Sequence, residues 1–317
     1  MSVEFFLQIA LAKGVGDVTI KRILHYFSDN HGASWDLLCS DKSIRNSFFW
    51  NKPEIVESIA LMSEPARRIA HELERNCIKV IFYNDDVYPK KLKELLGDKC
   101  PPYLFYKGNI SLTNKKTVGF CGSRKASLKG MAIAHDCASQ LVKSEIVVVS
   151  GYAAGIDIAA HKAALTNSGE TIFVLAEGIL KTTLKKDVRE LLNCENHLFV
   201  SQFMPESVWT AGNAMNRNRV ILGLSDAMIL VESGKKGGTF EAGNAALSMN
   251  HPLFVIDFAQ PEVSAEANPY FISRGGIPIR GKNGNPNLAE VYKALNKPKH
   301  FYNDAYSNGN QFQLGVG

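Results

Sequence analysis

Four glycine-containing segments with hydroxyl or basic side chains follow short apolar runs of the sequence. The first is Gly122-Ser123-Arg124, directly after Thr117–Cys121. Glycine lets an anion approach the backbone, a serine hydroxyl and the free N–H groups of a following helix donate hydrogen bonds, and an arginine guanidinium matches a phosphate. The G-x-G-x-x-G dinucleotide pattern is missing here. The segment therefore predicts either a phosphate contact of another kind or a plain strand-to-helix turn.

The second segment runs from Ser150 and Gly151 through Gly155 to Asp157, and its small residues expose the backbone to a ligand. Asp157 is placed to cap the following helix, and His161 lies one turn further along the same face. An Asp–His pair suggests catalysis, but a local helix contact is the preferred interpretation.

The third and fourth segments add positive charge. Arg217 and Arg219 stand two apart at the expected start of a helix, so they point in different directions, one toward a phosphate and one toward its own loop. Lys235 and Lys236 lie among glycines that end at Gly238. They predict a basic loop suited to a polyanion, with an ordinary flexible loop as the alternative.

The elements that must position these segments alternate between strands and helices. Continuous apolar runs predict strands that are buried on both faces, and helical patterns lie between them. The strands are expected at Thr117–Cys121, Ile146–Val149, Thr171–Leu175, His197–Val200, Ala227–Val231 and Leu253–Ile256, with helices such as Gly130–Val142 and Ile156–Leu165. This order predicts an α/β fold, an extended Rossmann-like, mainly parallel sheet with helices on both faces.

In such a sheet the loops after the strands meet at the carboxyl ends, where ligands bind. The four segments together therefore predict a basic, glycine-rich rim that holds phosphates. Lys181, Lys185 and Lys186 follow the strand that ends at Leu175 and are expected to extend this rim.

The remaining residues suggest further parts. Residues 1–75 read as a small helical domain whose Lys13-Gly14-Val15-Gly16 turn is typical of a DNA-binding helix-hairpin-helix unit and equally of a plain helical hairpin. Residues 76–116, with the strand-like run Val80–Tyr83, are expected to connect this domain to a core at 117–297. The polar residues 298–317 are expected to form a flexible tail.

Composition sets broad limits on function. The chain has 317 residues, of which 45% are hydrophobic and 21% charged, and its formal net charge of +5 permits a nucleic-acid partner without demanding one. The six cysteines are scattered without metal-ligand spacing, so neither a metal nor another cofactor is expected. No secretory leader and no apolar run of the ~18 residues that span a membrane is present, which favours a cytoplasmic protein without membrane contact.

Taken in order along the chain, the motifs resemble the DprA/Smf family of DNA-processing proteins. The resemblance covers about residues 80 to 280 and, more loosely, the N-terminal hairpin. It rests on Tyr88-Pro89, Pro101 to Gly108, Val118 to Arg124, Val149 to Asp157 with His161, Ala164-Leu165, Gly169 to Leu175, Arg217 to Ser225, Asn268 to Ile272 and Gly275-Gly276.

The resemblance implies a homodimer that binds single-stranded DNA in a basic pocket and that loads the RecA recombinase onto incoming DNA during natural transformation, without catalytic turnover. By position, Arg124 is then the main phosphate contact. The other expected nucleic-acid-binding residues are Gly122, Ser123, Ser150, Gly151, Arg217, Arg219, Lys235, Lys236 and Gly238. Many members also carry a C-terminal winged-helix domain, for which the segment after Asn283 is too short, so functions tied to that domain are not expected.

One departure from the family pattern gives an alternative function. Where the family usually has a Ser-Gly-Ser or Ser-Gly-Thr step and a Thr-Ala pair, this chain has Gly237-Gly238-Thr239-Phe240-Glu241. That loop resembles the Gly-Gly-x-Gly-Thr-x-x-Glu loop of LOG-type phosphoribohydrolases, which cleave nucleoside monophosphates with an Arg and a Glu. One glycine is absent and Glu241 comes one residue early, which turns its carboxylate by about 100° on a helix. A nucleotide-binding protein or N-ribosidase with Glu241 as catalytic residue is the second hypothesis, and a scaffold for protein partners is the third.

Overall fold

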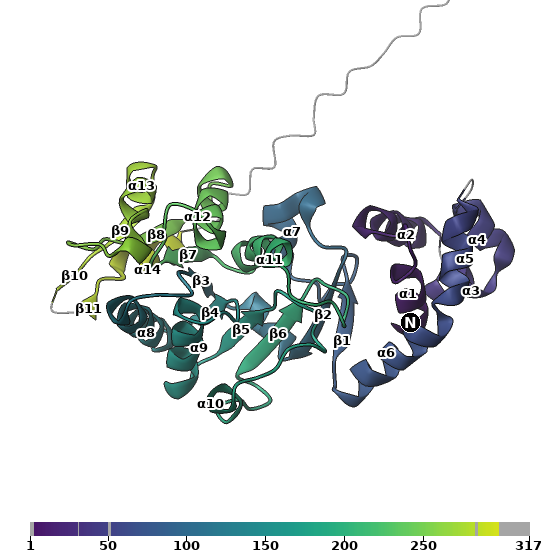
Figure 1. Ribbon diagram of the computed structural model, residues 1–317, viewed down its shortest axis with the longest axis horizontal. Coiled ribbons are helices and arrows are strands. Elements are labelled where there is room, and N and C mark those ends of the chain that lie inside the picture. The colour runs from purple at the N-terminus through teal and green to yellow at the C-terminus, as the bar shows by residue number, and fades with distance from the viewer. Residues whose placement is uncertain (1–2, 31, 50–51, 283–284, 298–317) are drawn as a thin grey trace, which may run out of the picture.

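The computed structural model describes residues 3–30, 32–49, 52–282 and 285–297. The expected tail at 298–317 lies outside the described residues. Within them, a nine-stranded sheet has the order β1-β2-β6-β5-β4-β3-β7-β8-β9, and β10 and β11 form a separate pair (Figure 1). The mainly parallel α/β sheet predicted from the apolar runs is confirmed.

The strands are β1 (Lys79–Phe82), β2 (Tyr103–Gly108), β3 (Thr117–Cys121), β4 (Val147–Ser150), β5 (Thr171–Val174), β6 (His197–Ser201), β7 (Ala227–Leu230), β8 (Leu253–Ile256), β9 (Ile277–Ile279), β10 (Gly281–Lys282) and β11 (Asn285–Pro286). The helices of the first part are α1 (Val3–Ala10), α2 (Asp17–Asp29), α3 (Trp35–Ser40), α4 (Lys42–Phe48), α5 (Pro53–Leu61), α6 (Ser63–Arg75) and α7 (Lys90–Leu96). Those of the second part are α8 (Leu128–Val142), α9 (Ile156–Thr166), α10 (Lys186–Arg189), α11 (Ala211–Gly223), α12 (Gly238–Ser248), α13 (Asn268–Ser273) and α14 (Ala289–Asn296), and short 3₁₀ turns are η1 (Gly97–Lys99), η2 (Ile110–Asn114) and η3 (Val263–Ala265).

Helices cover both faces of the sheet because successive strand residues point to opposite sides. Phe120 lies with α8, α9 and α14 in the core of one face. The neighbouring Cys121 lies with α7, α11, α12 and α13 in the core of the other face. This two-sided burial is why the strands are continuous apolar runs rather than alternating ones.

The segment at 76–116 is more than a connector, because it supplies the antiparallel edge of the sheet. β1 pairs antiparallel with β2, and β2 pairs antiparallel with β6. β2 was not foreseen, since the prolines at 101 and 102 suggested a break. These prolines stand just before the first residue of β2, Tyr103, so their missing N–H groups remove no hydrogen bond from the interior of the strand.

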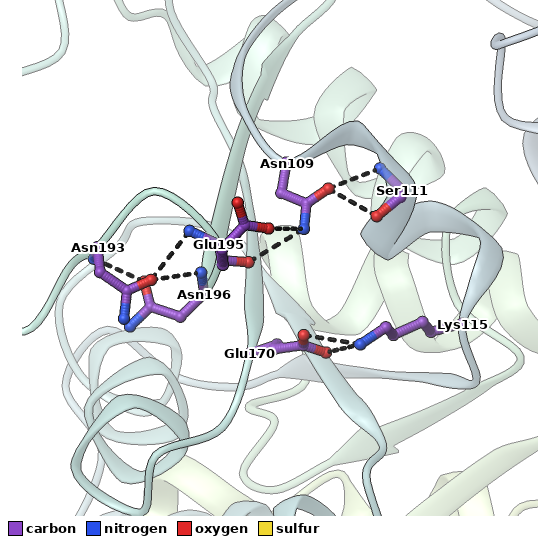
Figure 2. A network of polar contacts seen from close by, with 7 residues as sticks. All are labelled: Asn109, Ser111, Lys115, Glu170, Asn193, Glu195 and Asn196. Atoms are coloured by element: carbon purple, nitrogen blue, oxygen red, sulfur yellow. Dashed lines mark hydrogen bonds and ion pairs between the residues drawn. The ribbon is translucent and has the colours of Figure 1, made fainter.

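Polar contacts hold the end of this segment to the core (Figure 2). The side chain of Asn109 donates to the backbone and side-chain oxygens of Glu195, both at 3.2 Å, and its own oxygen accepts from Ser111 at the start of η2. Lys115 forms an ion pair with Glu170 at 2.7 Å. The turn between β2 and β3 is thereby fixed to the loops that precede β5 and β6.

The N-terminal helices share a hydrophobic core with the sheet. Phe6 of α1 is fully buried, with ring-centroid distances of 4.8 Å to Phe82 of β1 and 5.1 Å to Tyr103 of β2. Phe173 of β5 and Phe199 of β6 belong to the same core. The helical part therefore packs on the sheet through buried aromatic side chains, beside β1 in Figure 1.

Candidate functional site

A cleft of about 490 Å³ lies at the carboxyl ends of β3, β4 and β7. β3 stands between β4 and β7, so the chain passes to one side of β3 and later returns on the other, which opens a crevice at this edge. The cleft is lined, among others, by Gly122, Ser123, Arg124, Asp157, Trp209, Arg217, Asn218, Lys236, Gly238 and Thr239.

The structure separates the expected binding residues into two groups. Gly122, Ser123, Arg124, Arg217, Lys236 and Gly238 line the cleft; Ser150, Gly151, Arg219, Lys235 and Glu241 do not. Of the second group, Ser150 is fully buried and donates to the Phe120 carbonyl at 2.8 Å, and Lys235 pairs with Glu266 at 3.1 Å. Both Arg219 and Glu241 are exposed.

The lysines expected to extend the rim also lie elsewhere. Lys181 lines a separate cavity, and Lys186 pairs with Glu190 at 3.7 Å.

Arg124 is an exposed cation of the cleft, and an unforeseen aromatic ring lies beneath it. Its guanidinium carbon is 5.0 Å from the ring centroid of Trp209, which is 47% exposed. Trp209 lies next to Thr210, the N-cap of α11, whose hydroxyl accepts from the Asn213 N–H. An exposed tryptophan beside a helix cap was the sequence signal for it, because such rings stack on cations and on nucleic-acid bases.

Arg217, by contrast, is 5% exposed and comes from the middle of α11, not from its start as expected. Its Nη1 lies 3.6 Å from Oδ2 of Asp157. Burial lowers the pKa of Arg217, the Asp157 carboxylate opposes that shift, and the charge of Arg124 adds to it. Burial likewise raises the pKa of Asp157, against the opposing effect of Arg217. Among the described residues no acceptor meets the buried Nε of Arg217, so the protein itself leaves one donor of this guanidinium unsatisfied.

Gly151 makes room for this guanidinium. A Cβ on Gly151 would lie 1.5 Å from Nη1 of Arg217, far inside van der Waals contact. A side chain at position 151 would therefore displace Arg217. Gly151 is therefore placed to accommodate the arginine.

His161 has partners of its own. Burial lowers its pKa to about 3, so the ring is neutral. Its Nε2 faces the Gly151 carbonyl, which only accepts, so Nε2 carries the proton, and Nδ1 lies 2.6 Å from the Thr171 hydroxyl oxygen, which also contacts the Val148 carbonyl. Within the described chain no hydrogen bond or ion pair joins Asp157 to His161. The two residues thus form no catalytic dyad through a direct hydrogen bond.

The helix after Gly122-Ser123-Arg124 is capped from within the protein, which leaves fewer free N–H groups than expected. The carboxylate of Glu232, from the end of β7, accepts from the backbone N–H of Ser127 at 2.9 Å and from its hydroxyl. Ser127 in turn caps α8 by accepting from the Gly130 N–H at 2.9 Å. An internal carboxylate therefore occupies the place that a phosphate would take at this helix.

The N-terminus of α12 also lies at the cleft. Gly237 precedes it with a φ of +100°, and no described side chain caps it. Lys236, Gly238 and Thr239 all line the cleft, and Asn218 donates to the Gly238 carbonyl at 3.0 Å, which ties α12 to α11. Free N–H groups beside a lysine form a site for an anion.

The fold and the cleft define the chain as a Rossmann-like α/β protein with a basic cleft at the carboxyl edge of its sheet. Residues 79–280 match the model of the DNA recombination-mediator protein A family. The chain belongs to this family, and the DprA/Smf resemblance inferred from its motifs is confirmed.

Relatives and solved structures agree with this assignment. The chain is 34% identical over 174 residues to the DNA processing protein DprA of Streptococcus pneumoniae, covering 54% of this chain and 60% of the relative, and 28% identical over 181 residues to that of Bacillus subtilis, covering 56% and 60%. It therefore spans about 60% of the length of these relatives. The S. pneumoniae structure has a TM-score of 0.73 at 26% identity, covering 89% of this chain and 96% of that one.

DNA processing protein A from Helicobacter pylori, described for its unique single-stranded DNA binding mode, shares the fold at 23% identity with a TM-score of 0.56, over 69% of this chain and 94% of that one. Among the residues that the structure describes, no helix is both long and apolar enough to cross a membrane, and no group of three or more His, Cys, Asp or Glu side chains could hold a metal.

Proposed function

We propose that this protein binds single-stranded DNA in the cleft, mainly through phosphates and with little sequence preference. The observation that carries the proposal is the exposed Arg124 over Trp209, in the same cleft as the uncapped N-terminus of α12 and Lys236. Membership of the family and the single-stranded DNA binding described for the H. pylori protein support it.

The chemistry of the cleft fits a nucleic-acid strand. Arg124, Lys236 and the N–H groups of α12 donate to phosphate oxygens, and the exposed ring of Trp209 offers a surface on which a base stacks. Arg124 and Arg217 raise the electrostatic cost of each other's charge, and a bound phosphate relieves it.

Glu241 does not favour the alternative of nucleotide hydrolysis. It is exposed and lies outside the residues that line the cleft. A carboxylate that acts on a bound nucleotide must reach the reacting atoms, so its placement supports binding over turnover. We therefore propose a binding protein of the cytoplasm that works as a homodimer and hands single-stranded DNA to a RecA-type recombinase, as the family resemblance implies.

A gel-shift titration with a single-stranded oligonucleotide across salt concentrations tests the proposal. If about two phosphates are neutralised per chain, the logarithm of the association constant falls with the logarithm of salt with a slope of about −1.4. Arg124→Ala is expected to weaken binding by at least ~1.5 kcal/mol, about tenfold, because charged hydrogen bonds are lost.

Arg219→Ala is the matched control, since it removes the same side chain from an exposed site outside the cleft. Absence of any shift at ~50 mM salt would disprove the proposal. Equal effects of the two substitutions would show that the DNA lies elsewhere. Light scattering checks the dimer, whose mass is twice 34.9 kDa.

A further inference from the structure

A second cavity, of about 710 Å³, lies away from the phosphate cleft, on the sheet face that carries the N-terminal helices. Its walls come from α6, from the end of β2, from β6 and from the long loop between β5 and β6 that contains α10. Clefts of this size, at the junction of two parts of a protein, are where small ligands usually bind.

One part of the cavity wall, its floor, is apolar. Phe199 and Leu175 of the sheet, which are 4% and 2% exposed overall, contribute to its floor. Ile78 and Ile179, each 8% exposed, line it as well. A phosphate or a metal ion alone gains nothing from such a surface, whereas a planar organic ring is desolvated favourably on it.

The rim of the cavity carries more positive charges than its own carboxylates neutralise. Of its two carboxylates, Glu206 is held by Arg68 through two hydrogen bonds of 2.9 and 2.6 Å, and Glu72 pairs with Arg75 at 3.9 Å. Lys107, Lys181 and Arg189 also line the cavity, and in the described part of the chain none of these three has a carboxylate within 4.0 Å. A ligand with two or three negative charges would complete this rim.

Polar groups stand between the apolar floor and the charged rim. The hydroxyl oxygen of Thr182 is buried, and no described group forms a hydrogen bond with it. The Asn76 amide donates to the Glu72 carbonyl at 2.8 Å, which leaves the amide oxygen as an acceptor. Burial lowers the pKa of His197, and its Nδ1 faces the Asn196 side-chain oxygen at 3.4 Å, so the neutral ring offers Nε2 as an acceptor. Ribose hydroxyls and ring nitrogens are groups that such partners recognise.

We propose that this cavity binds a nucleoside phosphate, with the base on the apolar floor beside Phe199 and the phosphates at Lys107, Lys181 and Arg189. Such a ligand contacts α6 and the sheet at once, where the Arg68–Glu206 bond already joins them. Its binding therefore stabilises the docking of the helical part on the sheet. The site does not depend on the phosphate cleft or on the function proposed for it.

Isothermal titration calorimetry of the full chain with AMP, ADP, ATP and inorganic phosphate tests the proposal. At least one nucleotide should bind saturably, and inorganic phosphate should bind at least about tenfold more weakly because it leaves the floor uncovered. The double variant Lys181→Glu/Arg189→Glu should weaken nucleotide binding by about tenfold or more, through the loss of two charged hydrogen bonds. Lys186→Glu is the matched charge reversal on the same loop, outside the cavity, and should leave the affinity unchanged.

Two further variants test whether nucleotides bind in this cavity. Valine has the same shape as threonine, and the Thr182 hydroxyl has no hydrogen-bond partner among the described residues, so Thr182→Val should retain the fold. It should weaken nucleotide binding roughly 2- to 10-fold. Arg124→Ala, in the phosphate cleft, should leave nucleotide binding intact, and Lys181→Glu/Arg189→Glu should leave oligonucleotide binding intact.

Three results would overturn the proposal: no saturable nucleotide binding up to about 1 mM, equal affinity for inorganic phosphate, or nucleotide binding that Arg124→Ala removes and the rim variants leave unchanged. Loss of oligonucleotide binding in Arg124→Ala alone bears on the cleft and not on this cavity. The two proposals therefore fail separately.

Discussion

The buried pair of Arg217 and Asp157 predicts that Arg217→Met destabilises the fold. Methionine keeps an unbranched side chain of similar reach but removes the charge. The two side chains are 6% and 9% exposed and 3.6 Å apart, so at an effective dielectric constant of ~20 their attraction is about 4–5 kcal/mol. Removal of one partner from a buried pair typically costs about 3–5 kcal/mol because the other charge stays buried. We expect the free energy of unfolding to fall by about this amount near pH 7.

The pH dependence of this loss follows from the pKa of Asp157. Burial raises that pKa, and Arg217 is the main influence that lowers it again, so Arg217→Met raises it further. A carboxyl with a raised folded-state pKa keeps its proton where the unfolded chain has lost it. The destabilisation should therefore be small below the unfolded-state pKa of ~3.9 and grow as pH rises above it.

Urea unfolding followed by circular dichroism measures both effects. Asp157→Asn added to Arg217→Met removes the unpaired charge and keeps an oxygen that can accept from the Ala153 N–H, so it should recover part of the loss, with a coupling energy of about 0.5–3 kcal/mol. If Arg217→Met unfolds at the wild-type urea concentration yet abolishes oligonucleotide binding, then Arg217 is a phosphate ligand and not an internal clamp.

Two other substitutions test the packing behind the cleft. His161→Gln should make the protein less sensitive to acid. The buried ring of His161 stays neutral with a pKa of about 3, so the wild-type protein loses stability as pH falls below the unfolded-state value of ~6.5, by ~2.7 kcal/mol two pH units lower. Urea unfolding at pH 7 and pH 4.5 measures this, and an equal change in the exposed control His135→Gln would contradict it. Gly151→Ala should destabilise the protein by about 2–4 kcal/mol, since its Cβ would displace Arg217; in the Arg217→Met background the same change should cost much less, and full additivity in urea unfolding would show that the two residues do not compete for space.

The central sheet was predictable because its strands are buried on both faces. Thr117–Cys121 and Leu253–Ile256 are β3 and β8 with the expected bounds, since continuous apolar runs of this length have no other stable place in an α/β fold. β2 escaped prediction because two prolines precede it, and its partner β6 lies almost a hundred residues further along the chain. Sequence periodicity reports how a strand is buried, but not which strand it pairs with.

The location of the candidate site was predictable, but not which of its residues are open to a ligand and which are paired within the protein. The rule that ligands bind at the carboxyl ends of parallel strands placed Gly122-Ser123-Arg124 and Gly238 at one edge. Local sequence does not reveal that Glu232, 105 residues from Ser127, closes the N-terminus of α8. Nor does residue type distinguish an exposed arginine from a buried one, and that difference decides whether Arg124 or Arg217 meets solvent.

Internal carboxylates explain why the cleft relies on few groups. Asp157 neutralises Arg217, Glu232 occupies the end of α8, and Glu266 holds Lys235. Each of these anions is held in place by the fold and pairs with a group that a phosphate could otherwise meet. Arg124, Lys236 and the N-terminus of α12 line the cleft and remain open to a ligand. A DNA strand held by so few contacts on one chain binds much more tightly when a dimer offers a second copy of the cleft. Once the first cleft has bound, the same DNA molecule is present at a high effective concentration for the second cleft. The small set of open donors is therefore itself an argument for the proposed homodimer.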